Sequence, residues 1–115
     1  MSQSRKTRAD RERERAEAER RAWEQFRPKL DALQSFADAM KLVQEAPRPD
    51  SPGRRFYSNL GFFLNSFAVP MGSNYEERAL YLKLIQRFDT AGELKPGAGQ
   101  KIQQDLRRAM EAEGN

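Results

Sequence analysis

A chain of 115 residues is long enough for one modest domain and too short for two independent ones. With 37% hydrophobic and 33% charged residues it is more polar than a typical globular domain, and its formal net charge is +4. Histidine and cysteine are absent, which excludes disulfides, thiolate chemistry, zinc sites with sulfur or imidazole ligands, and a histidine general base.

The first 22 residues predict an N-terminal arm, a charged Arg/Glu-rich helix that is partly disordered. From Arg5 to Glu24 the sequence is almost entirely Arg, Glu and Ala, which are strong helix formers. Opposite charges recur at helical spacing, as in Arg13 and Glu17. Because no large apolar side chain lies between Met1 and Trp23, nothing is expected to fix the arm to a core.

A helical seam of apolar residues follows, at spacings of three and four. Its members are Trp23, Phe26, Leu30, Leu33, Ala37 and Met40. The spacing is that of a coiled coil, but Phe36 and Val43 widen the seam, which favours a helix packed on several neighbours. Pro28 lies inside this pattern and removes one backbone hydrogen bond, so we expect a kink, or a helix break just before it.

Residues 46–53 predict a connector, because three prolines within six residues prevent a continuing helix. Ser51 followed by Pro52 predicts the N-cap and first residue of the next helix. Helical spacing then places five apolar side chains on one face: Phe56, Leu60, Phe63, Leu64 and Phe67.

Two further helices are expected. Ser73 and Glu76 match a capping box before a segment that is apolar over most of its circumference, which predicts a central helix. Gly92 is placed to end this helix in a left-handed conformation. The last helix is amphipathic, with Ala98, Ile102, Leu106, Ala109 and Met110 on one side.

Together these elements predict an all-α fold. We expect a small bundle of about four helices over residues 23–113, preceded by a long charged helix that is kinked or broken near Pro28. No apolar run approaches the roughly 18 residues of a transmembrane span, and the first residues are charged. We therefore expect a cytoplasmic protein without membrane contact.

No motif indicates an enzyme, a cofactor or a small-molecule substrate. The segment that begins at Asp89 faintly resembles a calcium-binding loop, but Ala91 and Gln100 stand where that loop needs oxygen ligands, the second of them a glutamate. Carboxylates show no spacing that predicts acid–base catalysis. We expect no catalytic residues, no metal and no cofactor.

The remaining function is binding to a macromolecule, and two classes stay open. The first is a protein–protein interaction module, such as an adaptor, a subunit or an inhibitor or regulator of a larger machine. Trp23, Phe26 and Leu30 would then bind another protein or a second copy of the chain, since aromatic anchors often dominate interface energy.

The alternative is nucleic-acid binding through basic residues of the N-terminal arm, of the helix that starts near Ser51 and of the last helix. Residues 1–27 contain nine basic and six acidic side chains, whereas residues 28–115 contain twelve and eleven, so only the arm carries a clear excess of cations. The candidate contacts outside the arm are Arg54, Arg55, Tyr57, Lys101, Arg107 and Arg108.

Overall fold

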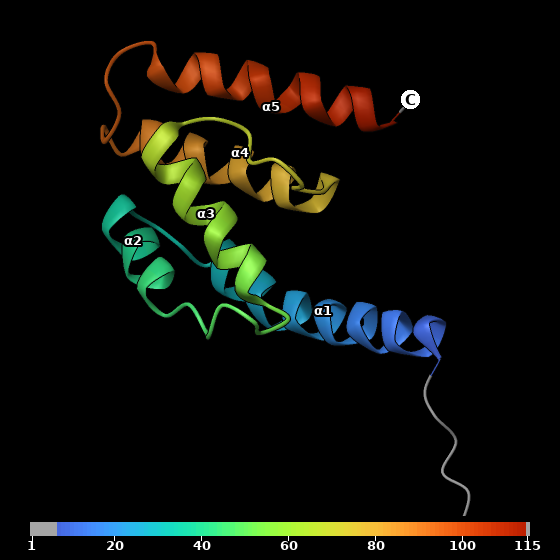
Figure 1. Cartoon of the computed structure of the whole chain (residues 1–115). Coiled ribbons are helices and arrows are strands. Elements are labelled where there is room, and N and C mark those ends of the chain that lie inside the picture. The colour runs from blue at the N-terminus through green and yellow to red at the C-terminus, as the bar shows by residue number, and fades with distance from the viewer. Residues whose placement is uncertain (1–6, 115) are drawn as a thin grey trace, which may run out of the picture.

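The computed structural model describes residues 7–114, and this part of the chain forms five helices and no strand. The helices are α1 (Arg8–Asp31), α2 (Phe36–Gln44), α3 (Arg54–Ser66), α4 (Tyr75–Thr90) and α5 (Ala98–Gly114). In Figure 1, α4 lies between α5 and the group formed by α1, α2 and α3. The predicted all-α bundle is therefore confirmed, and α4 occupies its middle.

The start of α1 projects away from the bundle (Figure 1). Thr7 and Asp10 form a capping box, in which the Thr7 hydroxyl accepts from the Asp10 N–H at 3.1 Å and the Asp10 carboxylate accepts from the Thr7 N–H at 3.2 Å. The described part of the N-terminal arm, residues 8–22, is helical; residues 1–6 lie outside the described residues. Because of this projection the molecule measures 66 × 34 × 20 Å.

The chain breaks after Pro28 instead of just before it. Helix α1 runs through Pro28 and ends at Asp31. Pro28 has no N–H to donate to the backbone carbonyl of Glu24, one turn earlier. Because Pro28 and Glu24 are both exposed, water can bind that carbonyl instead. At the break, Nη1 of Arg87 in α4 donates to the carbonyls of Asp31 at 2.6 Å and Leu33 at 2.9 Å.

The break shifts the phase of the predicted seam. Ser35 caps α2 by accepting from the Asp38 N–H at 3.1 Å, and α2 buries Ala39. The seam prediction therefore holds from Trp23 to Leu33 and again at Met40, which packs against the core, but it is wrong for Ala37, which is exposed.

The start of α3 also differs from the prediction. Gly53, not Ser51, is the N-cap residue, and no side chain caps this helix. The Ser51 carbonyl instead accepts from the Arg54 N–H at 3.1 Å within a turn of the connector. A Cβ on Gly53 would lie 3.0 Å from the Ala22 Cβ, so the base of the N-terminal arm packs closely on the connector.

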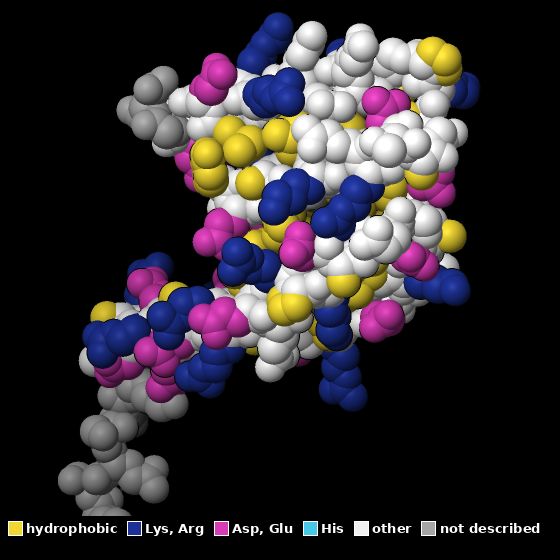
Figure 2. All heavy atoms as spheres, turned by 180° about the vertical axis from the view of Figure 1, so that it is seen from behind, with side chains coloured by type: hydrophobic (Ala, Val, Ile, Leu, Met, Phe, Trp, Pro, Cys, Tyr) yellow, Lys and Arg dark blue, Asp and Glu magenta, His cyan; other side chains and the backbone are white. Residues whose placement is uncertain are grey.

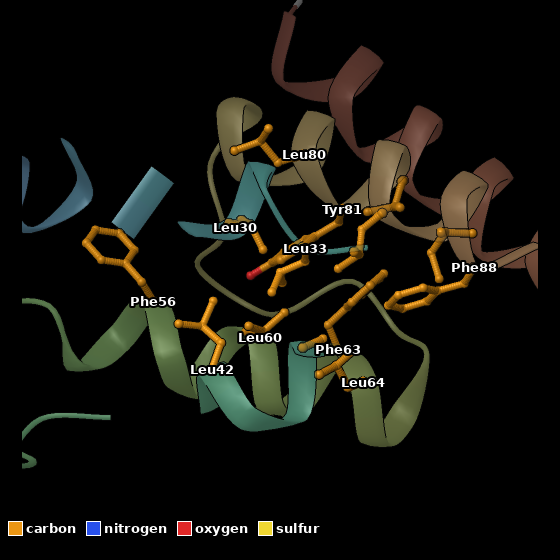
Figure 3. Close-up of a cluster of buried hydrophobic side chains, with 14 of the residues drawn as sticks. Leu30, Leu33, Leu42, Phe56, Leu60, Phe63, Leu64, Leu80, Tyr81 and Phe88 are labelled. Carbon is orange, nitrogen blue, oxygen red and sulfur yellow. The ribbon is translucent and has the colours of Figure 1, made fainter. Parts of the chain in front are cut away.

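The core lies where the described helices meet, and Figure 3 shows side chains from the end of α1 and from α2, α3 and α4 converging on it. Helix α5 adds Ile102 and Leu106. Phe63 stacks on Tyr81 with ring centroids 4.5 Å apart. The predicted apolar face of α3 is confirmed, since Phe56, Leu60 and Phe63 are buried, as is Leu64.

Both ends of α4 are closed by hydrogen bonds. Its N-cap is Asn74 paired with Glu77, one residue later than the predicted capping box. At the other end Gly92 takes a φ of 74°, as predicted, and the Glu93 N–H donates to the Phe88 carbonyl at 2.9 Å. Among the described helices, none is long and apolar enough to cross a membrane.

Candidate interaction surfaces

The three residues predicted to bind a partner occupy different environments. Phe26 and Leu30 are buried in the core of their own chain, with 2% and 1% of their surface exposed. Trp23 is half-buried: its ring centroid lies 5.1 Å from that of Phe56, and its Nε1 donates to the Glu76 carboxylate at 2.7 Å. Of these three residues, only Trp23 therefore reaches the surface.

The base of the N-terminal arm is joined to α3 and to the loop before α4. The Glu19 carboxylate accepts from Arg55 Nε at 2.8 Å, and Arg55 Nη2 lies 2.7 Å from the same oxygen. Arg55 Nη1 donates to the Gly72 carbonyl at 2.6 Å. A partly exposed ion pair adds only about 0–1 kcal/mol of stability, so this network mainly sets the direction of the arm.

A hollow separates the N-terminal arm from the end of the bundle, and Figure 2 shows hydrophobic side chains on the wall opposite the arm. The start of α4 lies at this end of the molecule (Figure 1). Met71 is 96% exposed there and Tyr75 is 51% exposed. Tyr75 adjoins Glu76, which binds Trp23 at the base of the arm, and Met71 adjoins Gly72, which binds Arg55, the α3 partner of Glu19.

The residues predicted to contact nucleic acid are not brought together. Arg55 is engaged by Glu19, Arg54 Nη1 donates to the Pro47 carbonyl at 2.5 Å, and Tyr57 is half-buried, with its ring centroid 4.7 Å from that of Phe26. Lys101, Arg107 and Arg108 are exposed on α5, which is separated from the start of α3 by α4 (Figure 1). The predicted single patch is therefore divided between two sides of the molecule.

A polar cleft does join Arg54 and Arg55 to the N-terminal arm. It has a volume of about 640 Å³ and lies between the arm, the connector and the start of α3. Its lining residues are Arg15, Glu19, Pro49, Asp50, Ser51, Pro52, Arg54, Arg55 and Ser58. Arg15 is the cation that sequence reasoning did not single out, although the arm as a whole was a candidate.

An apolar groove of about 430 Å³ lies between the ends of α3 and α4 and the starts of α2 and α5. Phe36, Leu64, Phe67 and Leu94 provide its apolar lining. Phe67 has a φ of 46°, the left-handed region, which costs a residue other than glycine on the order of 1–3 kcal/mol. The Glu93 carboxylate accepts from the Phe36 N–H at 3.0 Å at the edge of this groove.

A carboxylate is buried between α3 and α4. Glu77 is 0% exposed, and its oxygens accept from the Asn74 N–H at 3.2 Å and the Asn59 amide at 3.0 Å. The Tyr81 hydroxyl donates weakly to it at 3.5 Å. Burial, and then the charge and hydrogen bond of Glu77, raise the pKa of Tyr81 far above its ordinary value of 10.0.

This shift predicts a loss of stability at alkaline pH. Because the pKa of Tyr81 is raised on folding, its proton is held by the folded chain and released by the unfolded chain above pH 10.0. Its stabilising contribution is complete below that pH and falls by about 1.4 kcal/mol per unit above it. Urea unfolding at a series of alkaline pH values should show a steeper decline for the parent chain than for Tyr81→Phe, and equal slopes would contradict the shift.

No cluster of three or more metal-binding side chains occurs among the described residues. No protein-family model matches the chain, and neither the curated proteins nor the solved structures gave a significant match.

Proposed function

We propose that this chain is a non-enzymatic protein–protein interaction module and that the hollow beside the N-terminal arm receives its partner. The observation that carries the proposal is the exposure of Met71 and Tyr75, which lie four residues apart in the sequence around the start of α4. Exposed apolar side chains gathered in a concave, polar-rimmed region mark interaction sites more often than scattered ones do. Methionine adapts to different partners, and tyrosine offers a large contact area.

The flank of the N-terminal arm that faces the hollow has small side chains. Ala9 and Ala16 precede Trp23 at intervals of seven residues, so they lie on the same side of α1 as the Trp23 ring, which contacts Glu76 of α4. Small residues on a helix surface let a second helix approach closely. This favours a helical segment as the occupant of the hollow.

The charges around the hollow define the chemistry of that segment. Glu12 borders the alanine flank, and Glu76 is exposed beside Tyr75, whereas Glu19 is already paired with Arg55. A partner helix with apolar residues on one face and lysine or arginine at its edges would complement these carboxylates. The proposed partner is therefore a basic amphipathic helix of another protein.

The test is binding of a fluorescein-labelled helical peptide with leucines on one face and lysines at its edges, measured by fluorescence anisotropy. Met71→Ser with Tyr75→Ser should weaken binding at least about tenfold, which corresponds to about 1.4 kcal/mol. Phe62→Ser is the matched control, because Phe62 is an apolar residue that is 48% exposed on α3, outside both the N-terminal arm and the start of α4.

Two results would contradict the proposal. The first is binding that is insensitive to Met71→Ser with Tyr75→Ser but lost in Leu94→Ser, which would place the peptide in the groove between the ends of α3 and α4. The second is that a peptide with glutamates in place of the lysines binds as tightly as the lysine peptide. That result would show that the carboxylates around the hollow do not attract the partner.

A further inference from the structure

The N-terminal arm has a second flank, which carries a row of arginines. Arg8, Arg11 and Arg15 recur at spacings of three and four, and Ala18 and Ala22 continue the same row. Because Ala22 packs against Gly53 of the connector, this row runs from the tip of the arm into the polar cleft. It is a different flank from the one that faces the hollow.

The arginines of this row and cleft outnumber the carboxylates beside them, because Glu12 and Glu14 flank the row and Glu19 and Asp50 line the cleft. Arg11 and Arg15 form no ion pair with any described residue. Arg8 pairs with Glu12 at 3.4 Å, but the two side chains are 93% and 67% exposed, and water screens such a pair strongly. The partner of Arg54 is the uncharged Pro47 carbonyl, which orients the guanidinium without neutralising it.

The two carboxylates that line the cleft do not cancel the charge of its three arginines. Glu19 is occupied by Arg55, so that pair is close to neutral. Asp50 lies on the connector and opposes Arg15 and Arg54. Helix α3 begins beside them with no side-chain cap and no acidic residue in its first turn, which adds to the positive potential.

We propose that the row Arg8, Arg11 and Arg15, together with Arg54 in the cleft, binds the phosphate backbone of a nucleic acid. Successive arginines of the row are separated by about 5 Å along the helix axis. A line of cations suits an extended polyanion better than a single phosphate, and guanidinium groups bind phosphate oxygens in pairs. Since these contacts would be to the backbone, binding is independent of base sequence and strongly salt-dependent.

The experiment measures anisotropy of a labelled thymidine oligonucleotide of about 20 nucleotides and of a duplex of that length, between about 50 and 200 mM salt. Arg11→Gln with Arg15→Gln removes two charges from the row, and glutamine keeps a good helix propensity. Arg107→Gln with Arg108→Gln removes two charges from exposed positions of α5 and serves as the matched control.

The row variant should bind at least tenfold more weakly at the low-salt end, and the slope of log affinity against log salt should fall by about 1.4 to 1.8, as expected for two lost phosphate contacts. The α5 variant should change affinity less than twofold. Circular dichroism of both variants checks that the helices persist.

Three results would overturn this proposal. One is an equal loss in the row and α5 variants, which would mean that net charge alone attracts the polyanion. Another is no binding by the parent chain at the lowest salt. The third is displacement of the oligonucleotide by polyglutamate at the same charge concentration, which would assign the row to an acidic protein segment.

Discussion

Replacing Glu77 with alanine is expected to lower the free energy of unfolding by about 3 kcal/mol, because the change leaves buried donors without an acceptor. The Asn59 amide, the Asn74 N–H and the Tyr81 hydroxyl all direct hydrogen bonds at this fully buried carboxylate. The same substitution removes half of the capping box of α4. Urea unfolding followed by circular dichroism measures the loss.

The neighbouring residue provides the control for this prediction. Glu76 is exposed and its one hydrogen bond is to Trp23, so Glu76→Ala should cost less than about 1 kcal/mol. Glu77→Gln should give an intermediate loss, because an amide retains one acceptor oxygen but presents its own donors to Asn59. A loss for Glu77→Ala no larger than that for Glu76→Ala would show that the buried network does not stabilise the fold.

Replacing Phe26 with alanine is expected to cost about 3–5 kcal/mol, the usual range for removing a buried phenyl ring. Its ring lies 5.9 Å from that of Phe56 and 4.7 Å from that of Tyr57, and the side chain is 2% exposed. In a chain of this size such a loss is a large part of the total stability. The measurement is the midpoint and slope of urea unfolding, with Gln25→Ala as an exposed neighbour that should change little.

This second prediction bears on any search for partners. A substitution at Phe26 that abolished binding would report unfolding, not loss of an interface contact. An unchanged helical signal and an unchanged midpoint of urea unfolding in Phe26→Ala would show that the core does not need this ring. Phe26 would then again be a candidate for contact with a partner.

The sequence predicts the helices well because each buries one apolar stripe. The faces of α3 and α5 follow directly from spacing, as Phe56 and Leu60 on α3 and Ile102 and Leu106 on α5 show. Helix ends are less well determined. Ser73 with Glu76 and Asn74 with Glu77 both fit the capping-box pattern, and the second is used because it places Glu77 against Asn59 of another helix.

The break between α1 and α2 shows a similar limit. Pro28 is the strongest local signal for ending a helix, yet α1 passes through it and stops where Arg87 binds the carbonyls of Asp31 and Leu33. Arg87 is more than fifty residues away in the sequence. No local pattern contains that contact.

The candidate surfaces were partly predictable for the same reason. Spacing alone aligns Arg8, Arg11 and Arg15, but only the packing of Ala22 on Gly53 shows that this row leads into the cleft. Exposure of Met71 is a tertiary property, because a methionine in a loop is as compatible with a core as with the surface. Trp23 is the first large apolar residue after the arm in the sequence, but its half-burial depends on its contacts with Phe56 and Glu76, which lie far from it in the sequence.

The continuity of α1 gives the N-terminal arm a mechanical property. One unbroken helix carries the exposed turns from Arg8 and the buried turns that hold Phe26 and Leu30. The projecting part is about 20 Å long and contains no glycine that could act as a hinge. A load applied at Arg8 is therefore transmitted as a torque to the core and to the Glu19–Arg55 pair at the arm's base. The arm works as a stiff lever, and whatever binds along it is held at a set angle to the bundle.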